Sequence, residues 1–255
     1  IYVFEDQLPA TVNVRFFARD QLGLETEGAY NVGVYRRYAW NHENLGEIWA
    51  QALPFASGNI AYGTAYSGTQ GSFVILNEAG ELVWEYAIGE GGALRNRMIY
   101  DPATDRIIAT DLNGDYWAFN DHGNGVAWFV EGGPGIASIV LSNSKIYTLT
   151  LQSVVNVRDV SNGSVLWSVG PLSSTTSFSR LAVDPNNEQV YFGNNDGTFF
   201  ALNQGGLLWT KETGGEIAGE AVIDANGNVY IGSEDGFIYA LDASGNDLWK
   251  TDVGG

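Results

Sequence analysis

The sequence predicts an all-β fold, a single β-propeller of about six four-stranded antiparallel blades, of which the first is irregular. Three observations lead to this prediction. Tryptophan recurs at intervals of roughly 40 residues, the length of one propeller blade. Asn-Gly and Asp-Gly turns separate short apolar runs, as they do in β-hairpins. No segment shows a sustained period of 3.6 residues, so we expect almost no helix.

The tryptophan repeat defines the blades. Each of these residues follows a glycine by three or four positions, and an apolar run ending in Asn or Asp precedes it. The structural repeat residues are Trp49, Trp84, Trp128, Trp167, Trp209 and Trp249. Asn and Asp open turns, and glycine supplies a positive φ where the chain reverses. Because a propeller sheet buries both faces against its neighbours, we expect each indole to pack between blades.

The blades are clearest towards the C-terminus. In the last one we expect strands at 221–224, 229–232, 237–241 and 247–251, with turns at Asn226-Gly227 and Asp235-Gly236. The preceding blade repeats the pattern with strands at 181–184, 190–193, 199–202 and 207–211. Four short strands per repeat favour a propeller over a barrel.

The N-terminal region departs from the repeat. Residues 58–255 hold five clearer blades, whereas residues 1–57 are an irregular first blade or an added β segment. Strands are expected at 1–5 and 12–18, and a further strand at 32–40 leads into 47–52. The whole chain, 1–255, is interpreted as one propeller domain.

Composition excludes several classes of function. The chain has 30 acidic and 12 basic residues and a net charge of −18, which disfavours binding to nucleic acid or to anionic lipid. It has no cysteine, so disulfides, thiolate metal sites and thiol catalysis are excluded. No apolar stretch approaches the roughly 20 residues of a membrane span. An acidic, lysine-poor surface favours an extracytoplasmic location: periplasmic, cell-surface or secreted.

Candidate chemical sites are few, and each has a simpler interpretation. Asp111, Asn113 and Asp115 form the best of three oxygen-rich turns that resemble the start of a calcium loop. Any calcium bound there would be structural, and ordinary hairpin-turn chemistry is the favoured interpretation. The two histidines, His42 and His122, lie in turns and are expected to be solvated.

Other charged groups also fit solvated positions better than a site. The acidic pairs are Glu234-Asp235 and Asp184 with Glu188, and the basic clusters are Arg36-Arg37 and Arg95 with Arg97. All of them are expected on the surface, so we assign no catalytic and no cofactor-binding residue.

The last repeat carries a family resemblance. Residues 229–242 read Val-Tyr-Ile-Gly-Ser-Glu-Asp-Gly-Phe-Ile-Tyr-Ala-Leu-Asp, and Gly245 and Trp249 follow. This resembles the PQQ-like (pyrroloquinoline-quinone-type) repeat, most clearly over 178–251. The resemblance implies a propeller. Members of the family include quinone-dependent dehydrogenases and an outer-membrane barrel-assembly lipoprotein. The dehydrogenases carry adjacent cysteines near the quinone, which this sequence lacks.

Three functional hypotheses follow. The leading one is a non-enzymatic extracytoplasmic propeller that binds or scaffolds a protein, a glycan or a neighbouring copy, the copy being engaged by the N-terminal strands in residues 1–20. The second is a quinone-dependent dehydrogenase-like enzyme, which would need the quinone and calcium. The third is a piece of a larger propeller surface protein. A repeat alone is evidence for a fold and not for a function.

Overall fold

The computed structural model describes residues 10–19, 25–34, 48, 52–54, 57–65, 70–90, 92–94, 97–120, 125–132, 136–177 and 179–254. The chain has two compact units, Ile1–Glu43 and Asn44–Gly255. Every regular element within the described ranges is a strand, which confirms the all-β prediction. In that part of the chain, no helix is long and apolar enough to cross a membrane.

The described residues of the N-terminal unit form a β-hairpin. Strand β1 (Ala10–Arg19) pairs antiparallel with β2 (Glu25–Val34) over their whole length, from Ala10 opposite Val34 to Arg19 opposite Glu25. Strand β1 covers the strand expected at 12–18. The strand expected to begin at residue 32 begins at Glu25 instead. It starts this early because each of its residues pairs with one residue of β1. Residues 1–9 and 35–47, where further strands were expected, lie outside the described residues.

In the described part of the unit Asn44–Gly255, the strands form five four-stranded antiparallel sheets, named here A to E in chain order. Sheet A consists of β3 (Leu53–Pro54), β4 (Ile60–Gly63), β5 (Gln70–Leu76) and β6 (Leu82–Glu90). Sheet B consists of β7 (Ile99–Asp101), β8 (Arg106–Thr110), β9 (Tyr116–Asn120) and β10 (Val126–Val130). Sheet C consists of β11 (Ile136–Ser142), β12 (Lys145–Thr150), β13 (Val155–Asp159) and β14 (Val165–Val169).

The last two sheets follow the predicted strands closely. Sheet D consists of β15 (Ala182–Val183), β16 (Val190–Gly193), β17 (Thr198–Asn203) and β18 (Gly206–Glu212). Sheet E consists of β19 (Val222–Ile223), β20 (Val229–Ser233), β21 (Phe237–Leu241) and β22 (Asp247–Asp252). Within each sheet the strands lie side by side in chain order.

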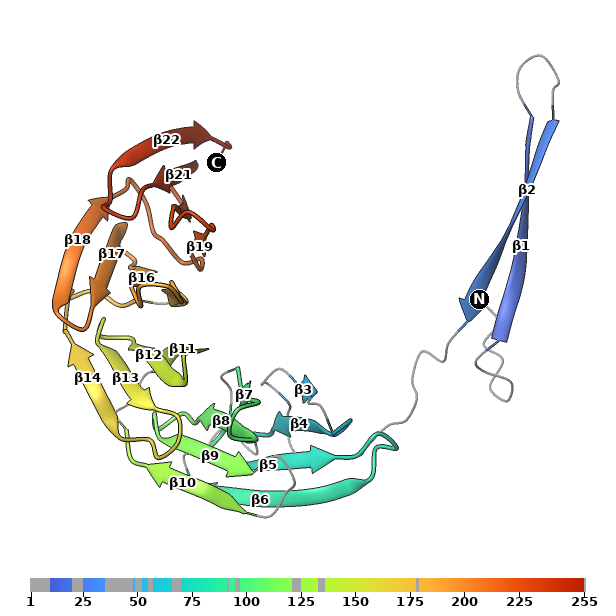
Figure 1. The fold of residues 1–255 in the computed structure, drawn as a ribbon, viewed down its shortest axis with the longest axis horizontal. Helices are drawn as coiled ribbons and strands as arrows, with labels where there is room; N and C mark the ends of the chain where they lie inside the picture. Colours follow the sequence, from blue (N-terminus) through green and yellow to red (C-terminus); the bar gives the residue numbers. More distant parts are fainter. Residues whose placement is uncertain are drawn as a thin grey trace. The chain divides into compact units, whose positions relative to one another are not determined.

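Within this unit the sheets follow one another along an arc, with the first strand of each sheet inside and the fourth outside (Figure 1). The inner strand β11 contacts β7 on one side and β15 on the other. Sheet E stands at one end of the arc. This succession of four-stranded blades confirms the propeller class. The expectation of a single domain over 1–255 stays a prediction.

In all five described sheets, one residue from each strand is paired with the next strand to form a row across the sheet, and this row ends at the repeated tryptophan on the fourth strand. We call it the register row, or tryptophan row. In sheet D the row is Ala182, Tyr191, Ala201 and Trp209, and in sheet E it is Val222, Tyr230, Ala240 and Trp249. A register shift just before each of these tryptophans inserts one extra residue in the fourth strand. The extra residues are Val83, Ala127, Leu166, Leu208 and Leu248. Each outer strand therefore carries a β-bulge at the same place.

The hydrophobic core lies between the sheets. We name the face that carries the tryptophan row the trailing face, and the opposite face the leading face. Trailing residues of sheet D, such as Tyr191 and Phe199, pack against leading residues of sheet E, such as Ile231 and Tyr239. Sheets B with C and C with D pack in the same way. Both faces are buried, which explains why β17 is apolar at four successive positions.

Candidate functional site

The contact between sheets D and E shows what a trailing face does when its neighbour is present. Three residues at alternate positions each reach sheet E; two of them lie on β18 and the third follows its last residue. The indole nitrogen of Trp209 donates to the carbonyl of Ala243 at 3.0 Å. The ammonium of Lys211 lies 2.6 Å from a carboxylate oxygen of Asp247. The hydroxyl of Thr213 accepts a hydrogen bond from Ser233 at 3.0 Å.

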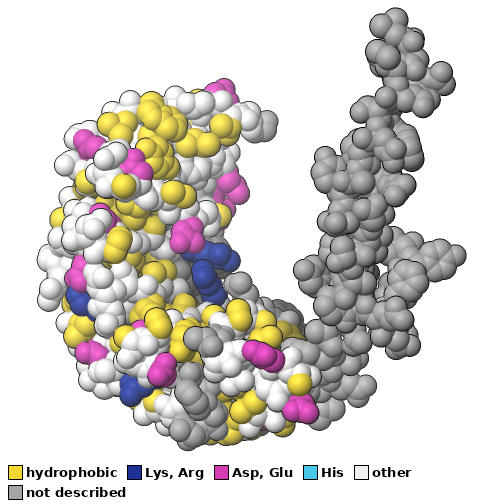
Figure 2. Space-filling view, turned by 45° about the vertical axis from the view of Figure 1, so that its right-hand side comes forward, with side chains coloured by type: hydrophobic (Ala, Val, Ile, Leu, Met, Phe, Trp, Pro, Cys, Tyr) yellow, Lys and Arg dark blue, Asp and Glu magenta, His cyan; other side chains and the backbone are white. Residues whose placement is uncertain are grey.

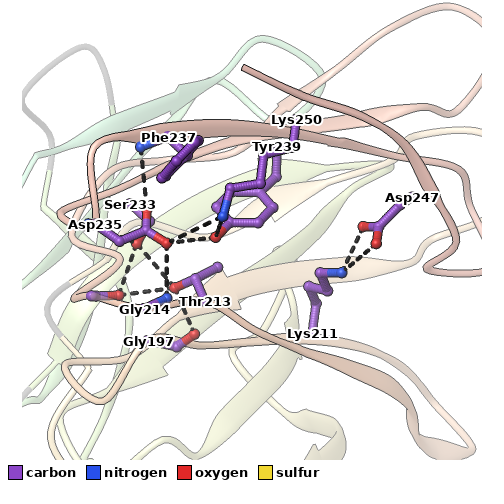
Figure 3. Close-up of polar contacts among 11 residues, drawn as sticks. Gly197, Lys211, Thr213, Gly214, Ser233, Asp235, Phe237, Tyr239, Asp247 and Lys250 are labelled. Carbon is purple, nitrogen blue, oxygen red and sulfur yellow. Dashed lines mark hydrogen bonds and ion pairs between the residues drawn. The ribbon is translucent and has the colours of Figure 1, made fainter. Parts of the chain in front are cut away.

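Asp235 completes this contact from the side of sheet E (Figure 3). Its carboxylate accepts hydrogen bonds from the Gly214 nitrogen at 2.8 Å and from the Tyr239 hydroxyl. Burial alone would raise the pKa of Asp235, but the hydrogen bonds that it accepts lower the pKa below its usual value. The Lys250 ammonium donates to the Tyr239 hydroxyl at 2.8 Å and lies 3.6 Å from the Phe237 ring centroid.

A glycine in the second strand forms a socket for the following sheet. A Cβ on Gly193 would lie 2.3 Å from the Cβ of Ile217, and one on Gly63 would lie 2.4 Å from the Cβ of Leu94. Ile217 precedes Val222, the first residue of the tryptophan row in sheet E, by five positions. Leu94 precedes Ile99, the first residue of that row in sheet B, by the same number. Both Ile217 and Leu94 are fully buried. Each therefore fills a space that only glycine leaves open.

Between sheets C and D, the socket residue is large and the residue that faces it from the next sheet is small. Leu149 stands at the socket position, and Ser177 stands five residues before Ala182. Both are fully buried. A large residue in the socket is therefore matched by a small one from the next sheet, which indicates that the two positions are fitted to each other.

Trp84, Trp128 and Trp167 also lie at contacts between sheets. The indole of Trp128 donates to the Val160 carbonyl at 3.0 Å, and a Cβ on Gly163 would lie 2.8 Å from its ring. The Trp84 ring centroid is 6.0 Å from that of Phe119 on sheet B. Trp167 packs against the core between sheets C and D. Trp49 lies outside the described residues.

Sheet E presents the same kind of trailing face, on which no other described strand of the unit Asn44–Gly255 packs, and we name this surface the end face. On sheet D, Ala182 is 6% exposed and Phe199 is 1% exposed. At the equivalent positions on sheet E, Val222 is 64% exposed and Ile238 is 36% exposed. Trp249 is 46% exposed. Hydrophobic side chains gather over sheet E, at the top of the view in Figure 2.

The end face has an open socket and lacks a cation. Among the residues that the structure describes, no atom lies within 4 Å of the place that a Cβ on Gly232 would take. The trailing faces of sheets B, C and D each extend one cation to the next sheet: Arg106 to the Ser161 carbonyl, Lys145 to Glu188 and Lys211 to Asp247. At the matching register positions sheet E has Asn228 and Thr251. The face is therefore apolar and uncharged along its row.

The calcium candidate is an ordinary tight turn in this structure. One oxygen of Asp111 accepts the Asp115 nitrogen and the other accepts the Trp117 indole nitrogen, both at 3.0 Å. Burial raises the pKa of Asp111. Asn113 is exposed. Nowhere in the described ranges do three His, Cys, Asp or Glu side chains group so that they could share a metal ion. Calcium at Asp111, Asn113 and Asp115 stays a prediction.

The structure assigns different roles to two carboxylates that were expected to be solvated. Asp235 binds across the contact between D and E, and Glu188 forms an ion pair with Lys145 of sheet C at 2.6 Å. The signal that sequence reasoning missed is the alternation Trp209-x-Lys211-x-Thr213, which puts three contact residues on one side of the chain along β18 and just past its end. His42, His122, Arg36, Arg37 and Arg95 lie outside the described residues, and Arg97 is exposed.

Comparison with known families now identifies the repeat. The family model described as outer membrane protein assembly factor BamB matches residues 36–251. The chain belongs to this family. Its structure resembles that of BamB from Moraxella catarrhalis, with a TM-score of 0.58 and 18% identity over 80% of this chain and 64% of the other. It also resembles the computationally designed Ika8 protein, with a TM-score of 0.64 and 19% identity over 80% of this chain and 61% of the other.

These likenesses show the fold. The chain spans less than two thirds of the length of either matched structure. A search of curated proteins finds no match. Membership of the family agrees with the PQQ-like repeat seen in the sequence.

Proposed function

We propose that this protein is a non-enzymatic extracytoplasmic β-propeller that binds another protein. The observation that carries the proposal is the match of the family model over residues 36–251; within the described unit, Trp249 and Val222 are exposed on sheet E and offer a surface to a partner. Tryptophan is enriched among the residues that dominate binding at protein interfaces. A contiguous apolar face of this kind is typical of a docking surface.

The family gives the partner class. Its model is described by outer-membrane protein assembly, and we propose that the partner is a component of such an assembly and that the protein works outside the cytoplasm. The net charge of −18 fits a soluble protein that associates through a defined apolar face and not through charge.

Site-specific photocrosslinking tests the proposal. A photoreactive phenylalanine derivative replaces Trp249 in the chain, which is then secreted into the periplasm of a Gram-negative host. The control carries the same group at Gln204, an exposed position in the turn between β17 and β18. We expect an adduct with a second protein from position 249 and none from position 204. Equal adducts from both positions, or none from either, would contradict the proposal.

Two finer expectations stay predictions. A glycan ligand is checked by calorimetric titration with oligosaccharides. Pairing of residues 1–20 with a neighbouring copy is checked by deleting them and measuring the oligomeric state by light scattering; an unchanged monomer would exclude it. The dehydrogenase alternative is checked by adding the quinone with calcium and looking for a coloured, active complex.

A further inference from the structure

A polar pocket lies between sheets B and C, where β10 ends and where β12 turns into β13. Its volume is about 310 Å³, at the lower end of the range for small-molecule sites. The polar side chains that line it come from both sheets: Tyr116, Glu131, Thr150, Gln152, Asn156 and Arg158. Glu131 and Gln152 are exposed, so the mouth of the pocket is at the surface.

Sheet C departs from the repeat at Asn156, which lines this pocket. Asn156 stands directly before Val157, the residue of the tryptophan row on β13. The corresponding residues of sheets A, B, D and E are Val74, Trp117, Phe200 and Tyr239, all of them buried. Three of these four are aromatic. An amide in the place of an aromatic ring leaves room between the sheets.

Arg158 departs from the repeat in the same way, two residues further along β13. The corresponding residues of sheets A, B, D and E are Leu76, Phe119, Leu202 and Leu241, which are apolar and buried. Sheet C therefore has a cation where the other sheets have a core residue. The Cζ atom of Arg158 lies 4.3 Å from the Tyr116 ring centroid, and Nη1 donates to the Gly163 carbonyl at 2.8 Å.

The charge of Arg158 lacks an anionic partner. The Nε atom is buried and has no hydrogen-bond partner within the described ranges. In this part of the chain the ion pairs join lysines to carboxylates, and none of them includes Arg158. A guanidinium keeps its charge in a protein, and a half-buried charge without a counter-ion is costly. An anion that enters the pocket would remove this cost.

We propose that this pocket binds a small organic acid that has one carboxylate and a hydroxyl or ammonium group beside it. The carboxylate accepts hydrogen bonds from the planar guanidinium of Arg158 and from the Nδ2 of Asn156, whose Oδ1 already accepts from Ser168 at 2.8 Å. Glu131, at the rim, accepts from the hydroxyl or ammonium group and disfavours a second negative charge. Hydroxy acids and amino acids have this chemistry.

This inference goes beyond the proposed function, because the pocket lies between two inner sheets and takes a small molecule. Its test is an NMR titration of the ¹⁵N-labelled chain, with the Nε–H resonance of Arg158 as the local readout. The probes are L-lactate, L-serine, acetate and inorganic phosphate. We expect lactate and serine to shift this resonance to saturation, with a dissociation constant on the order of 1 mM. Acetate should bind more weakly, and phosphate should not saturate the shift.

Two variants give sheet C the residues that sheet D has at the same positions. Arg158→Leu, after Leu202, removes the charge, and Asn156→Phe, after Phe200, fills the pocket and keeps the arginine. Each should weaken the binding of lactate and serine about tenfold or more. Saturation-transfer NMR observed on the ligand measures both variants, and the resonance lost in Arg158→Leu assigns the signal. Circular dichroism shows that each variant is folded.

Arg97→Leu is the matched control. Arg97 is an exposed arginine that does not line this pocket, so this variant should bind the probes as the unchanged chain does. The inference would be overturned by an Arg158 resonance that no carboxylate shifts, or by phosphate that binds as tightly as lactate. It would also be overturned by unchanged binding in Asn156→Phe, or by an equal loss in Arg97→Leu. None of these outcomes bears on the photo-adduct at position 249, so the proposed function is tested separately.

Discussion

Adding one methyl group at two equivalent glycines should change stability in opposite directions. Gly193 and Gly232 occupy the same register position in sheets D and E. A Cβ on Gly193 would lie 2.3 Å from the Cβ of Ile217, whereas a Cβ on Gly232 would have no neighbour within 4 Å. Neither glycine has a positive φ, so alanine fits the backbone at both positions.

The magnitudes follow from these distances. Gly193→Ala overpacks a filled socket, and we expect it to lower the free energy of unfolding by about 1–3 kcal/mol. Gly232→Ala adds no clash and restricts the unfolded chain, so we expect it to raise the free energy of unfolding by about 0.4–1 kcal/mol. The difference between the two variants tests whether the end face is a trailing face without its neighbour.

Urea unfolding followed by circular dichroism measures both changes. The dependence of the free energy on urea should be the same for both variants, because the surface exposed on unfolding hardly changes. Equal effects of the same sign, or a neutral Gly193→Ala, would refute the fitted-socket argument.

Three further predictions concern individual side chains. Trp209→Phe removes an indole hydrogen bond to the next sheet and should lower the free energy of unfolding by about 1 kcal/mol, whereas Trp249→Phe should change it by less than about 0.5 kcal/mol; similar losses would contradict the distinction between inner and end faces. Hydrogen bonds, that from the Asn228 side chain first, lower the pKa of Asp224 to about 2 from 3.8. The stability that Asp224 contributes is therefore present above pH 3.8 and is lost as the pH falls through about 2. The melting temperature is measured over a series of acidic pH values. Asp224→Asn should make its fall with decreasing pH less steep, and an unchanged fall would show that other carboxylates cause it. Calcium or a chelator should leave the melting temperature unchanged, because both oxygens of Asp111 already accept hydrogen bonds; a rise with calcium would instead support a structural ion at that turn.

The strands of sheets D and E could be predicted almost to the residue because their turns are local. Asn226-Gly227 ends one strand and begins the next through its own backbone preferences, so the strand expected at 229–232 appears as Val229–Ser233. The first strands are different. β15 and β19 contain two residues each, fewer than the apolar runs in the sequence, because pairing at the inner edge depends on the neighbouring sheets.

The candidate site was less accessible from the sequence. Socket and plug are separated along the chain, and only the register shows that Gly193 meets Ile217. Asp235 and Glu188 look like turn carboxylates, and nothing local indicates that Gly214 and Lys145 bind them from the preceding sheets. The exposure of Trp249 was also hidden, because its sequence context matches that of Trp209, which has a sheet beside it.

The bulge before each tryptophan has a consequence for solubility. The fourth strand is the outer edge of each sheet and exposes apolar residues there, such as Leu166 and Leu208. An uninterrupted edge of this kind would be a template on which strands of other molecules could add and start amyloid growth. The extra residue shifts the pairing between the third and fourth strands, and a bulge of this kind twists an edge strand, which we expect to make it a poorer template for an incoming strand. The repeat thus protects its own rim from fibril formation in every blade.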